Sequence, residues 1–263
     1  MPTPIEILLD PISLCVLALY GGLMLWEALA PARELPRVRG WIPRALASFA
    51  VYFYLSSYLP LFWDDYLAQY QLVDLSSYGT WMGAAVGLFV YEGLLYVWHR
   101  TMHENSGLFR SFHQMHHSAE RLDSFGAFYF SPLDMVAFTL LGSLSLSLIV
   151  GLAPQAVTVF LFTTLFLGIF QHTNVKTPQW LGYLIQRPES HTVHHGRGLH
   201  RFNYSDLPVF DMLFDTFRNP RGYEMETGFY HGASARVADM LLLRDVSVAE
   251  PTPTDAPRIK AAA

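Results

Sequence analysis

Five long apolar stretches dominate the chain, and polar segments separate them. The stretches cover about residues 11–30, 45–63, 80–98, 133–151 and 154–172. Each approaches the roughly 20 residues that a helix needs to cross the hydrocarbon core of a membrane. Only the turn Gly151-Leu152-Ala153-Pro154 separates the last two, so they are expected to form one hairpin. The pattern predicts an all-α integral membrane protein with about five transmembrane helices.

The polar segments divide the chain into further parts. Residues 173–248 mix polar and aromatic positions with helical stretches, and they are expected to fold back as a cytosolic cap. Residues 249–263 are rich in Pro, Thr and Ala and have little to bury, so a disordered tail is expected there. The predicted division is transmembrane helices over 1–98, a histidine-rich cytosolic segment over 99–132, a transmembrane hairpin over 133–172, the cap and the tail.

The basic residues predict which way the helices face. All 17 Lys and Arg residues fall in segments 31–44 and 99–125 and beyond residue 172, on one side of a five-span arrangement. The opposite loops, 1–10 and 64–79, carry only acidic side chains. Because Lys and Arg are in excess on cytoplasmic loops, the basic side is expected to be cytoplasmic and the N-terminus to face outward. The same assignment predicts that the histidine clusters lie on the cytoplasmic side.

Composition and charge narrow the class of protein. Charged residues make up 15% of the chain and apolar residues 52%, whereas a soluble domain has about 25% charged residues. The net charge of −5 includes no basic stripe, so nucleic acid is not expected as a partner. The single cysteine, Cys15, cannot form an internal disulfide. Glu6 and Asp10 stand where a secretory signal has positive charge, so no cleavable signal is expected.

Nine of the eleven histidines fall into four clusters with chelating spacing. The clusters are His99 and His103; His113, His116 and His117; His172; and His191, His194 and His195. Residues three and four apart on a helix share a face, about 5–6 Å between Cβ atoms, so two imidazoles can bind one ion and a third can reach a second. By chance, H-x-x-H-H is expected roughly 0.02 times in such a chain, yet it occurs twice. The spacing predicts a dinuclear metal site.

The type of ligand limits the metal only loosely. A structural zinc ion takes four ligands in a closed tetrahedron, whereas nine histidines suit two ions with open positions. Imidazole binds Fe, Zn, Cu and Ni alike. His172 ends its stretch alone, so a capping or interfacial role is its alternative. His200 and His231 have no chelating partner nearby in sequence. Orienting a ligand histidine is the functional alternative for His200, but an ordinary core or surface role is favoured for both.

Glu92 lies inside the third apolar stretch, on the helical face that also carries Tyr96, His99 and His103. A glutamate within a membrane span is costly and usually faces a partner or a cavity. Two interpretations remain open. Glu92 either holds the free ring N–H of His99 or lines a substrate path, or it bonds to a neighbouring helix for packing alone.

In these motifs the chain resembles the fatty acid hydroxylase/sterol desaturase superfamily of membrane histidine-rich di-iron oxygenases. The resemblance rests on the ordered set HRTMH, HQMHH and HTVHH and on NYSDLPVFDMLFDTFR, from Asn203 to Arg218, and it covers about residues 80–220. The segment QHTNVK, with His172 and Asn174, is similar to a short histidine segment of the family. Lys176 follows there, whereas some members have a second histidine, and Phe210 stands where the family usually has tryptophan.

The resemblance implies an O2-dependent enzyme that hydroxylates or desaturates a C–H bond of a lipid, such as a fatty acyl chain or a sterol. Two iron ions would be its cofactors and O2 its co-substrate. The nine clustered histidines would be the metal ligands, and no further catalytic side chain is expected. The candidates for orienting the ligand imidazoles are Glu92, Asn174, Asn203, Asp206 and Asp211. Turn and helix-capping roles are the alternative for the two aspartates.

The partners implied are a lipid from the bilayer and a separate electron donor. The chain has no G-x-G-x-x-G motif, no C-x-x-C pair and no cytochrome-like appendage, so a reductase, ferredoxin or cytochrome is expected to deliver electrons. Aromatic residues that would roof a lipid site, or serve only as interfacial anchors, are Phe125, Phe128, Tyr129 and Phe130.

Three other functions compete with this hypothesis. Oxidation of a lipid headgroup or an ether lipid would use the same residues. A non-catalytic metal-binding or transport protein would place its ligands at the bilayer midplane with acidic partners, whereas these histidines collect at one interface. A bis-histidine haem protein would place single histidines inside facing spans rather than triads outside them.

Overall fold

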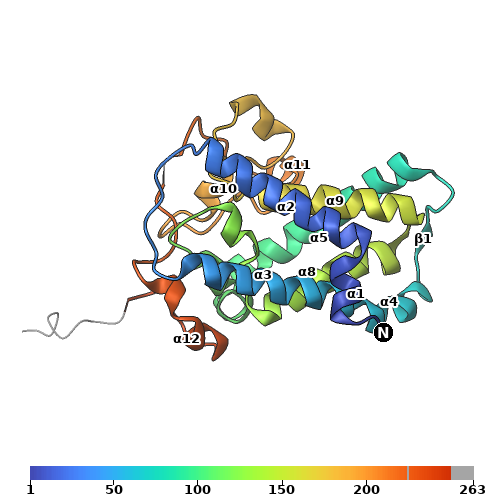
Figure 1. Ribbon diagram of the computed structural model, residues 1–263. Helices are drawn as coiled ribbons and strands as arrows, with labels where there is room; N and C mark the ends of the chain where they lie inside the picture. Colours follow the sequence, from blue (N-terminus) through green and yellow to red (C-terminus); the bar gives the residue numbers. More distant parts are fainter. Residues whose placement is uncertain (224, 250–263) are drawn as a thin grey trace, which may run out of the picture.

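The computed structural model describes residues 1–223 and 225–249, and it is mostly helical (Figure 1). Long helices form a single bundle, and most of the short helices and loops gather at one end of it, whereas α1 (Pro4–Leu9) and α4 (Pro60–Ala68) lie at the other end (Figure 1). The long helices are α2 (Pro11–Leu29), α3 (Trp41–Tyr58), α5 (Thr80–Glu104), α8 (Pro132–Ser143) and α9 (Pro154–Phe170). The predicted disordered tail lies outside the described residues, apart from residue 249.

Four helical stretches are long and apolar enough to cross a membrane. They are α2; α3 with α4 (Pro60–Ala68); α5; and α8 with the π-helix η3 (Leu144–Ile149). The fifth predicted span, α9, has 17 residues, which gives about 26 Å of helix against a hydrocarbon core of about 30 Å. The described residues thus contain four stretches of full length, and a fifth crossing by α9 stays a prediction.

The second stretch runs from Trp41 to Ala68, so the predicted range 45–63 is too narrow at both ends. Gly40 adopts a left-handed conformation immediately before the helix, with φ of 65°, which only glycine adopts without strain. Pro60 occupies the first position of α4, where its missing N–H costs little. The chain therefore continues as helix past the point where the apolar pattern weakens.

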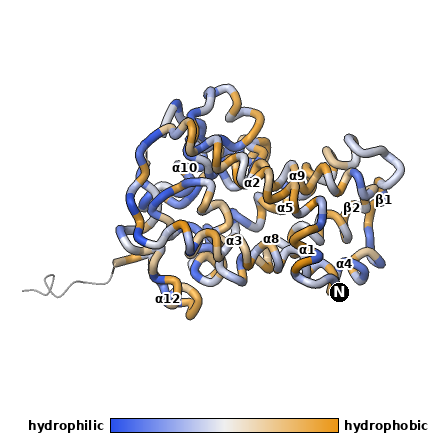
Figure 2. The backbone as a smooth tube through the Cα atoms, viewed as in Figure 1, coloured by the Kyte–Doolittle hydropathy of each residue, from blue (hydrophilic) through white to orange (hydrophobic). Residues whose placement is uncertain are grey.

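Hydrophobic residues follow the bundle, and hydrophilic residues are more frequent at the end that carries α10 (Pro188–His194) (Figure 2). Large apolar side chains are exposed on the outside of the long helices, among them Leu25, Phe62, Met82 and Phe89. Extensive exposed apolar surface of this kind marks contact with a membrane or a partner. The bundle surface thus agrees with a membrane protein.

A small parallel pair of strands joins the loop after α4 to the turn before α9. β1 (Val73–Asp74) pairs with β2 (Val150–Gly151). The prediction of an all-α protein missed this pair, because strands of two residues are too short to show an alternating pattern. Helix α9 then packs against α5, and the hairpin of the last two apolar stretches stays a prediction.

Glycines on α5 allow this helix to approach the start of α9 closely. A Cβ atom at Gly87 would lie 2.7 Å from Cδ1 of Leu152, and one at Gly83 would lie 3.2 Å from Cβ of Ala156. Small residues at such contacts bring helix backbones together in membranes. The contact fixes α5, whose other end carries His99 and His103.

The short elements of the opposite end surround the last turns of α5 and α9. They are α6 (Ser106–Leu108), η1 (Phe109–His113), α7 (Gln114–His117), η2 (Ser124–Phe128), η4 (Gln179–Tyr183), α10, α11 (Val209–Leu213), η5 (Ala233–Ala235) and α12 (Val237–Leu241). A buried cluster around Trp41 and Tyr129 joins them to α3. The Trp41 indole N–H donates to Asp123 at 3.0 Å, and the Tyr129 hydroxyl donates to the carbonyl of Ser234 at 2.6 Å.

Candidate metal centre

Five histidines from three separate segments form the first of two groups. Their candidate ligand nitrogens all lie within 4.8 Å of one another. The segments are the end of α5, the run from η1 into α7, and α10. The members of this group are His99, His103, His113, His117 and His194.

Four further histidines form the second group, again with nitrogens within 4.8 Å of one another. The members are His116, His172, His191 and His195. All nine clustered histidines therefore lie in one of two adjoining groups. His200 and His231 belong to neither, and His231 is exposed.

Helical spacing explains why each triad serves both groups. His113 and His117 are four residues apart and face the first group, whereas His116 faces the second. In the other triad the pair four residues apart faces the second group, and the histidine between them, His194, faces the first. Residues at i and i+4 share a helix face, and the intervening residue points to an adjacent direction. Two short helices thus link the two groups.

Several ring nitrogens approach one another at distances that suit a shared ion. Nε2 of His172 lies 3.1 Å from Nε2 of both His116 and His191, and Nε2 of His113 lies 2.9 Å from Nε2 of His99. Nitrogens bound to one ion at about 2.1 Å are about 3.0 Å apart when the bonds meet at right angles, and about 3.4 Å apart at the tetrahedral angle. The observed separations of 2.9–3.1 Å are therefore short enough for these imidazoles to share an ion.

The histidine rings are buried and neutral, so their free ring nitrogens can bind a cation. In the first group, Nε2 of His103, His117 and His194 is buried with no hydrogen-bond partner in the described part of the chain. Burial lowers the pKa of both triads well below the usual histidine value. These imidazoles therefore stay neutral with free lone pairs, as metal ligands must be.

Hydrogen bonds on the other ring nitrogen orient several of these histidines. Nδ1 of His99 donates to the carbonyl of Tyr204 at 2.8 Å, and Nδ1 of His194 donates to the carbonyl of Phe202 at 2.7 Å. Nδ1 of His113 lies 2.7 Å from Oδ2 of Asp134. A proton held on Nδ1 leaves the lone pair on Nε2, so that Nε2 of each ring is available to the ion that its group would bind.

Four of the five predicted supporting residues bond to backbone groups rather than to the histidine rings, and the carboxylate of Asp206 accepts from the side chain of Gln171. None of them hydrogen-bonds to a ligand imidazole within residues 1–223 and 225–249, so Glu92 does not hold His99. Its Oε2 instead accepts from the backbone N–H groups of Asp206 and Leu207, at 2.9 and 3.0 Å. The side chain of Asn174 donates to the carbonyl of Arg33 at 2.7 Å.

Asn203 and Asp211 shape the loop that carries the Tyr204 carbonyl. Asn203 has φ of 52°, a left-handed conformation that asparagine tolerates, and its amide donates to the carbonyl of Ser190, next to His191. Asp211 accepts from the backbone N–H groups of Tyr204 and Ser205. These contacts connect the loop to two of the segments that carry histidines.

Sequence reasoning missed Asp134 and underestimated His200. In the sequence, Asp134 looks like an acidic residue in the first turn of α8, where the Ser131 side chain caps the helix. Such a pattern is common at the start of helices. Nδ1 of His200 lies 3.1 Å from Nδ1 of His117. No sequence pattern connects either residue to a triad, because the contacts join segments 21 and 83 residues apart.

Replacing Asp134 with asparagine is expected to weaken metal retention about 10- to 100-fold, the range for partners of ligating histidines. The change keeps the shape of the side chain but removes the charge that orients and polarises His113. Metal content after a timed chelator challenge measures the effect. Asp239→Asn is the control, because Asp239 lies on α12 and pairs with Arg236 and Arg244. Equal metal retention by both variants would contradict this role for Asp134.

The metal-free protein is expected to lose stability as the pH falls below about 6.5, the ordinary pKa of histidine. Burial holds the pKa of triad members such as His117 and His195 well below that value. The unfolded chain therefore binds protons that the folded chain cannot, and each such histidine lowers stability by about 1.4 kcal/mol per pH unit below 6.5. Thermal unfolding of chelator-treated protein between pH 5.5 and 8 tests this. A midpoint that does not change across the range would refute it.

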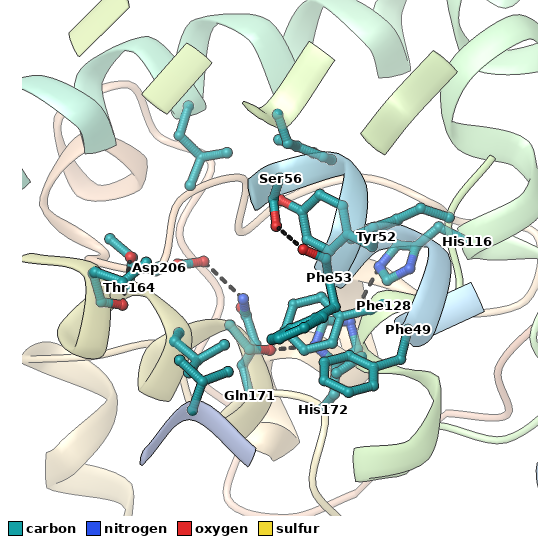
Figure 3. Close-up of a pocket in the computed structure, with 18 of the residues that line it drawn as sticks. Phe49, Tyr52, Phe53, Ser56, His116, Phe128, Thr164, Gln171, His172 and Asp206 are labelled. Atoms are coloured by element: carbon teal, nitrogen blue, oxygen red, sulfur yellow. Dashed lines mark hydrogen bonds between the residues drawn. The ribbon is translucent and has the colours of Figure 1, made fainter. Parts of the chain in front are cut away.

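A cavity of about 400 Å³ extends from the histidines into the bundle (Figure 3). Its wall includes His99, His113, His116, His172 and His191. Side chains of α2, α3 and α9 form much of the remainder, and α5, α8 and the segments 127–130 and 203–206 contribute the rest. Of the four aromatic residues predicted to roof the site, Phe128 and Phe130 line this cavity. Phe125 and Tyr129 pack instead in the cluster around Trp41.

Comparison with known proteins agrees with the resemblance. A sequence model described as fatty acid hydroxylase matches residues 84–216, a range that contains all nine clustered histidines. The chain is 34% identical over 142 residues to ornithine lipid hydroxylase OlsE of Rhizobium tropici, covering 51% of this chain and 41% of that protein. It is 29% identical over 168 residues to alkylglycerol monooxygenase of Caenorhabditis elegans, covering 60% of this chain and 30% of that protein.

A third relative is sphinganine C4-monooxygenase 1 of Arabidopsis thaliana, 25% identical over 134 residues, which are 49% of this chain and 52% of that protein. The matched regions span about half or less of each of these relatives. No solved structure matches the chain. The three relatives named above are a hydroxylase and two monooxygenases with lipid substrates in their names, and other relatives are named very-long-chain aldehyde decarbonylases. The comparisons thus support a role in lipid oxidation.

Proposed function

This chain belongs to the fatty acid hydroxylase family, and we propose that it is a membrane-bound enzyme that uses two iron ions and O2 to hydroxylate or desaturate a C–H bond of a lipid. The observation that carries the proposal is the meeting of two histidine groups with a largely apolar cavity inside a bundle of apolar helices. Most of the surface that the lining presents is apolar, which suits the hydrocarbon chain of a lipid.

The residues fit two metal ions. His99, His103, His113, His117 and His194 would hold one, and His116, His172, His191 and His195 would hold the other. The neutral shell of imidazoles would accept iron, one of several metals that imidazole suits, and the family match favours iron among them. When bound, the irons would supply the activation of O2. Five and four protein ligands leave positions open for it.

The protein itself would position the substrate carbon and keep water away. Phe49, Phe53 and Phe128 form an aromatic wall of the cavity, next to His116 and His172 (Figure 3). A chain held between such rings has few orientations, which is the main contribution a protein makes to chemistry that a cofactor performs. Hydroxylation also consumes two electrons from a donor, so a separate reductase, ferredoxin or cytochrome belongs to the proposal.

The proposed topology has five crossings, with α9 as the shortest span. The N-terminus would face outward, and both histidine groups would lie at the cytoplasmic interface, where the basic segments are. The segments 99–132 and 173–248 would then form the cytosolic part of the protein. Ether lipids remain within the proposed substrate class, because one relative is an alkylglycerol monooxygenase.

Mass spectrometry of lipid extracts tests the proposed function directly. Cells with and without the gene, grown in air, are compared after complementation with the wild-type chain or with His231→Ala, a change at an exposed histidine outside both groups. A lipid heavier by one oxygen would identify a hydroxylase, and a lipid lacking two hydrogens would identify a desaturase. If no lipid differs between cells with and without the gene, the proposal fails.

A further inference from the structure

Two buried polar side chains face each other in the wall of the cavity, and the metal groups leave them unused. Nε2 of Gln171 donates to Oδ1 of Asp206 at 2.7 Å. Both residues line the cavity, and their exposed fractions are only 6% and 8%. Figure 3 shows Gln171 reaching toward Asp206, with Thr164 close to the aspartate in the view.

The backbone holds this pair rigidly. The N–H of Asp206 donates to Glu92, and its carbonyl accepts from the N–H of Gln186 at 2.7 Å. Gln171 caps the last turn of α9. The aspartate side chain is therefore fixed in the cavity wall by contacts that do not involve its own carboxylate.

The pair leaves two oxygens free. A carboxylate can only accept, so the amide nitrogen of Gln171 must be the atom turned toward it, and Oε1 points elsewhere. Within residues 1–223 and 225–249, neither Oε1 of Gln171 nor Oδ2 of Asp206 accepts a hydrogen bond. Burial raises the pKa of Asp206 to about 6, so the carboxylate is ionised at neutral pH. Neither oxygen is sealed in the protein interior, and both residues line the cavity, so a bound molecule that brings a donor can reach them.

The pair also lies beside both histidine groups. Gln171 immediately precedes His172, and Asp206 follows Tyr204, the residue whose carbonyl holds His99, by two positions. The surrounding lining is mostly apolar, with Phe49, Phe128 and Leu165 among its residues. A ligand that fills this cavity would thus have apolar surroundings along its length and two acceptors close to the reacting end.

We propose that Asp206 and Gln171 form a hydrogen-bond-accepting subsite, which selects lipids that carry a hydroxyl or N–H donor near the carbon presented to the histidines. The reference to a reacting carbon rests on the proposed function. The binding preference itself does not depend on turnover. Sites built to bond a substrate hydroxyl can reject the analogue lacking it by roughly ten-thousandfold. For this cavity a smaller ratio is expected, a preference of about tenfold or more for the lipid that carries the donor.

Equilibrium binding of two radiolabelled probes to the purified protein in phosphatidylcholine nanodiscs tests the subsite. The probes are octadecanol and octadecane, which have the same chain length and differ by one hydroxyl, and empty nanodiscs provide the background. The wild-type protein is expected to prefer octadecanol by about tenfold or more. Asp206→Leu and Gln171→Met remove one acceptor each at similar volume, and each is expected to reduce the preference several-fold. Octadecane binding should stay the same or strengthen.

Thr163→Val is the matched control on α9, because Thr163 bonds to the carbonyl of Val159 within the helix and does not line the cavity. It should keep the wild-type preference. If Asp206→Leu fails to fold, Gln171→Met decides alone. Equal binding of the probes by the wild-type protein, or a preference that neither substitution alters, overturns the subsite even if lipid turnover is found. A preference that both substitutions reduce supports the subsite even if no turnover is found.

Discussion

Replacing His116 or His194 with alanine is expected to abolish lipid oxidation while the protein still inserts into the membrane. Each change removes one nitrogen from a different group, His116 from the group of four and His194 from the group of five. Loss of a partner that merely orients a ligand costs about 10- to 100-fold in metal affinity or activity, and loss of the ligand itself should cost at least as much. Turnover of the lipid identified by mass spectrometry is therefore expected to fall by more than about 100-fold.

Metal content separates this explanation from misfolding. Each variant is purified in detergent, and its bound iron is compared with that of the wild-type chain and of His231→Ala. The expected result is a loss of about one or both ions in the two variants, with helical content unchanged, because the long helices are stabilised mainly by lipid and by one another. His231→Ala should keep both metal and turnover. Normal turnover by either His116→Ala or His194→Ala would refute the proposed centre.

The apolar pattern predicted the helices well because membrane spans carry a strong, local signal. The structure has helices in all five predicted stretches, and the main difference is at their ends. The extension of α3 through Leu59 into α4 depends on a backbone geometry that hydropathy does not record. The two-residue strands form only because the loop after α4 and the turn at Gly151 meet in space.

The histidine groups could be predicted because chelating spacing is also a local property. Helical spacing brings His113 and His117 together whatever the rest of the fold does. The assembly of the groups from α5, α7, α9 and α10 needs the whole fold, and here the order of the motifs, through family resemblance, supplied the expectation. The family match confirms that resemblance.

The supporting contacts could not be predicted in detail because they join distant segments, often through backbone atoms. The group that holds His99 is a carbonyl 105 residues away, and every residue has a carbonyl. Asp134 is hidden in a helix start, as described above. Glu92 was correctly singled out as a buried acid that needs a partner, but its partners are two backbone N–H groups whose position depends on the loop after Asn203.

Replacing Asp211, which lies on α11 and binds this loop, is expected to destabilise the protein strongly. Its carboxylate is fully buried and accepts four hydrogen bonds, two from backbone N–H groups of Tyr204 and Ser205 and two from the hydroxyls of Ser205 and Thr216, at 2.7–3.0 Å. Asp211→Asn keeps the shape but turns an N–H group toward donors. The expected loss in the free energy of unfolding is about 3 kcal/mol, since bonds to a buried charge are lost and donors are left unpaired.

The consequence should extend to the metal centre, because the Tyr204 carbonyl orients His99. Thermal unfolding of the detergent-solubilised variant is expected about 5–10 °C below the wild-type midpoint, with weaker iron retention. Asp215→Asn is the matched control: Asp215 lies four residues further on, is exposed, and has φ of 59°, which asparagine also tolerates. It should shift stability by no more than about 0.5 kcal/mol. If Asp211→Asn unfolds at the same temperature as Asp215→Asn, then the buried carboxylate does not stabilise this loop, and the orientation of His99 must depend on other contacts.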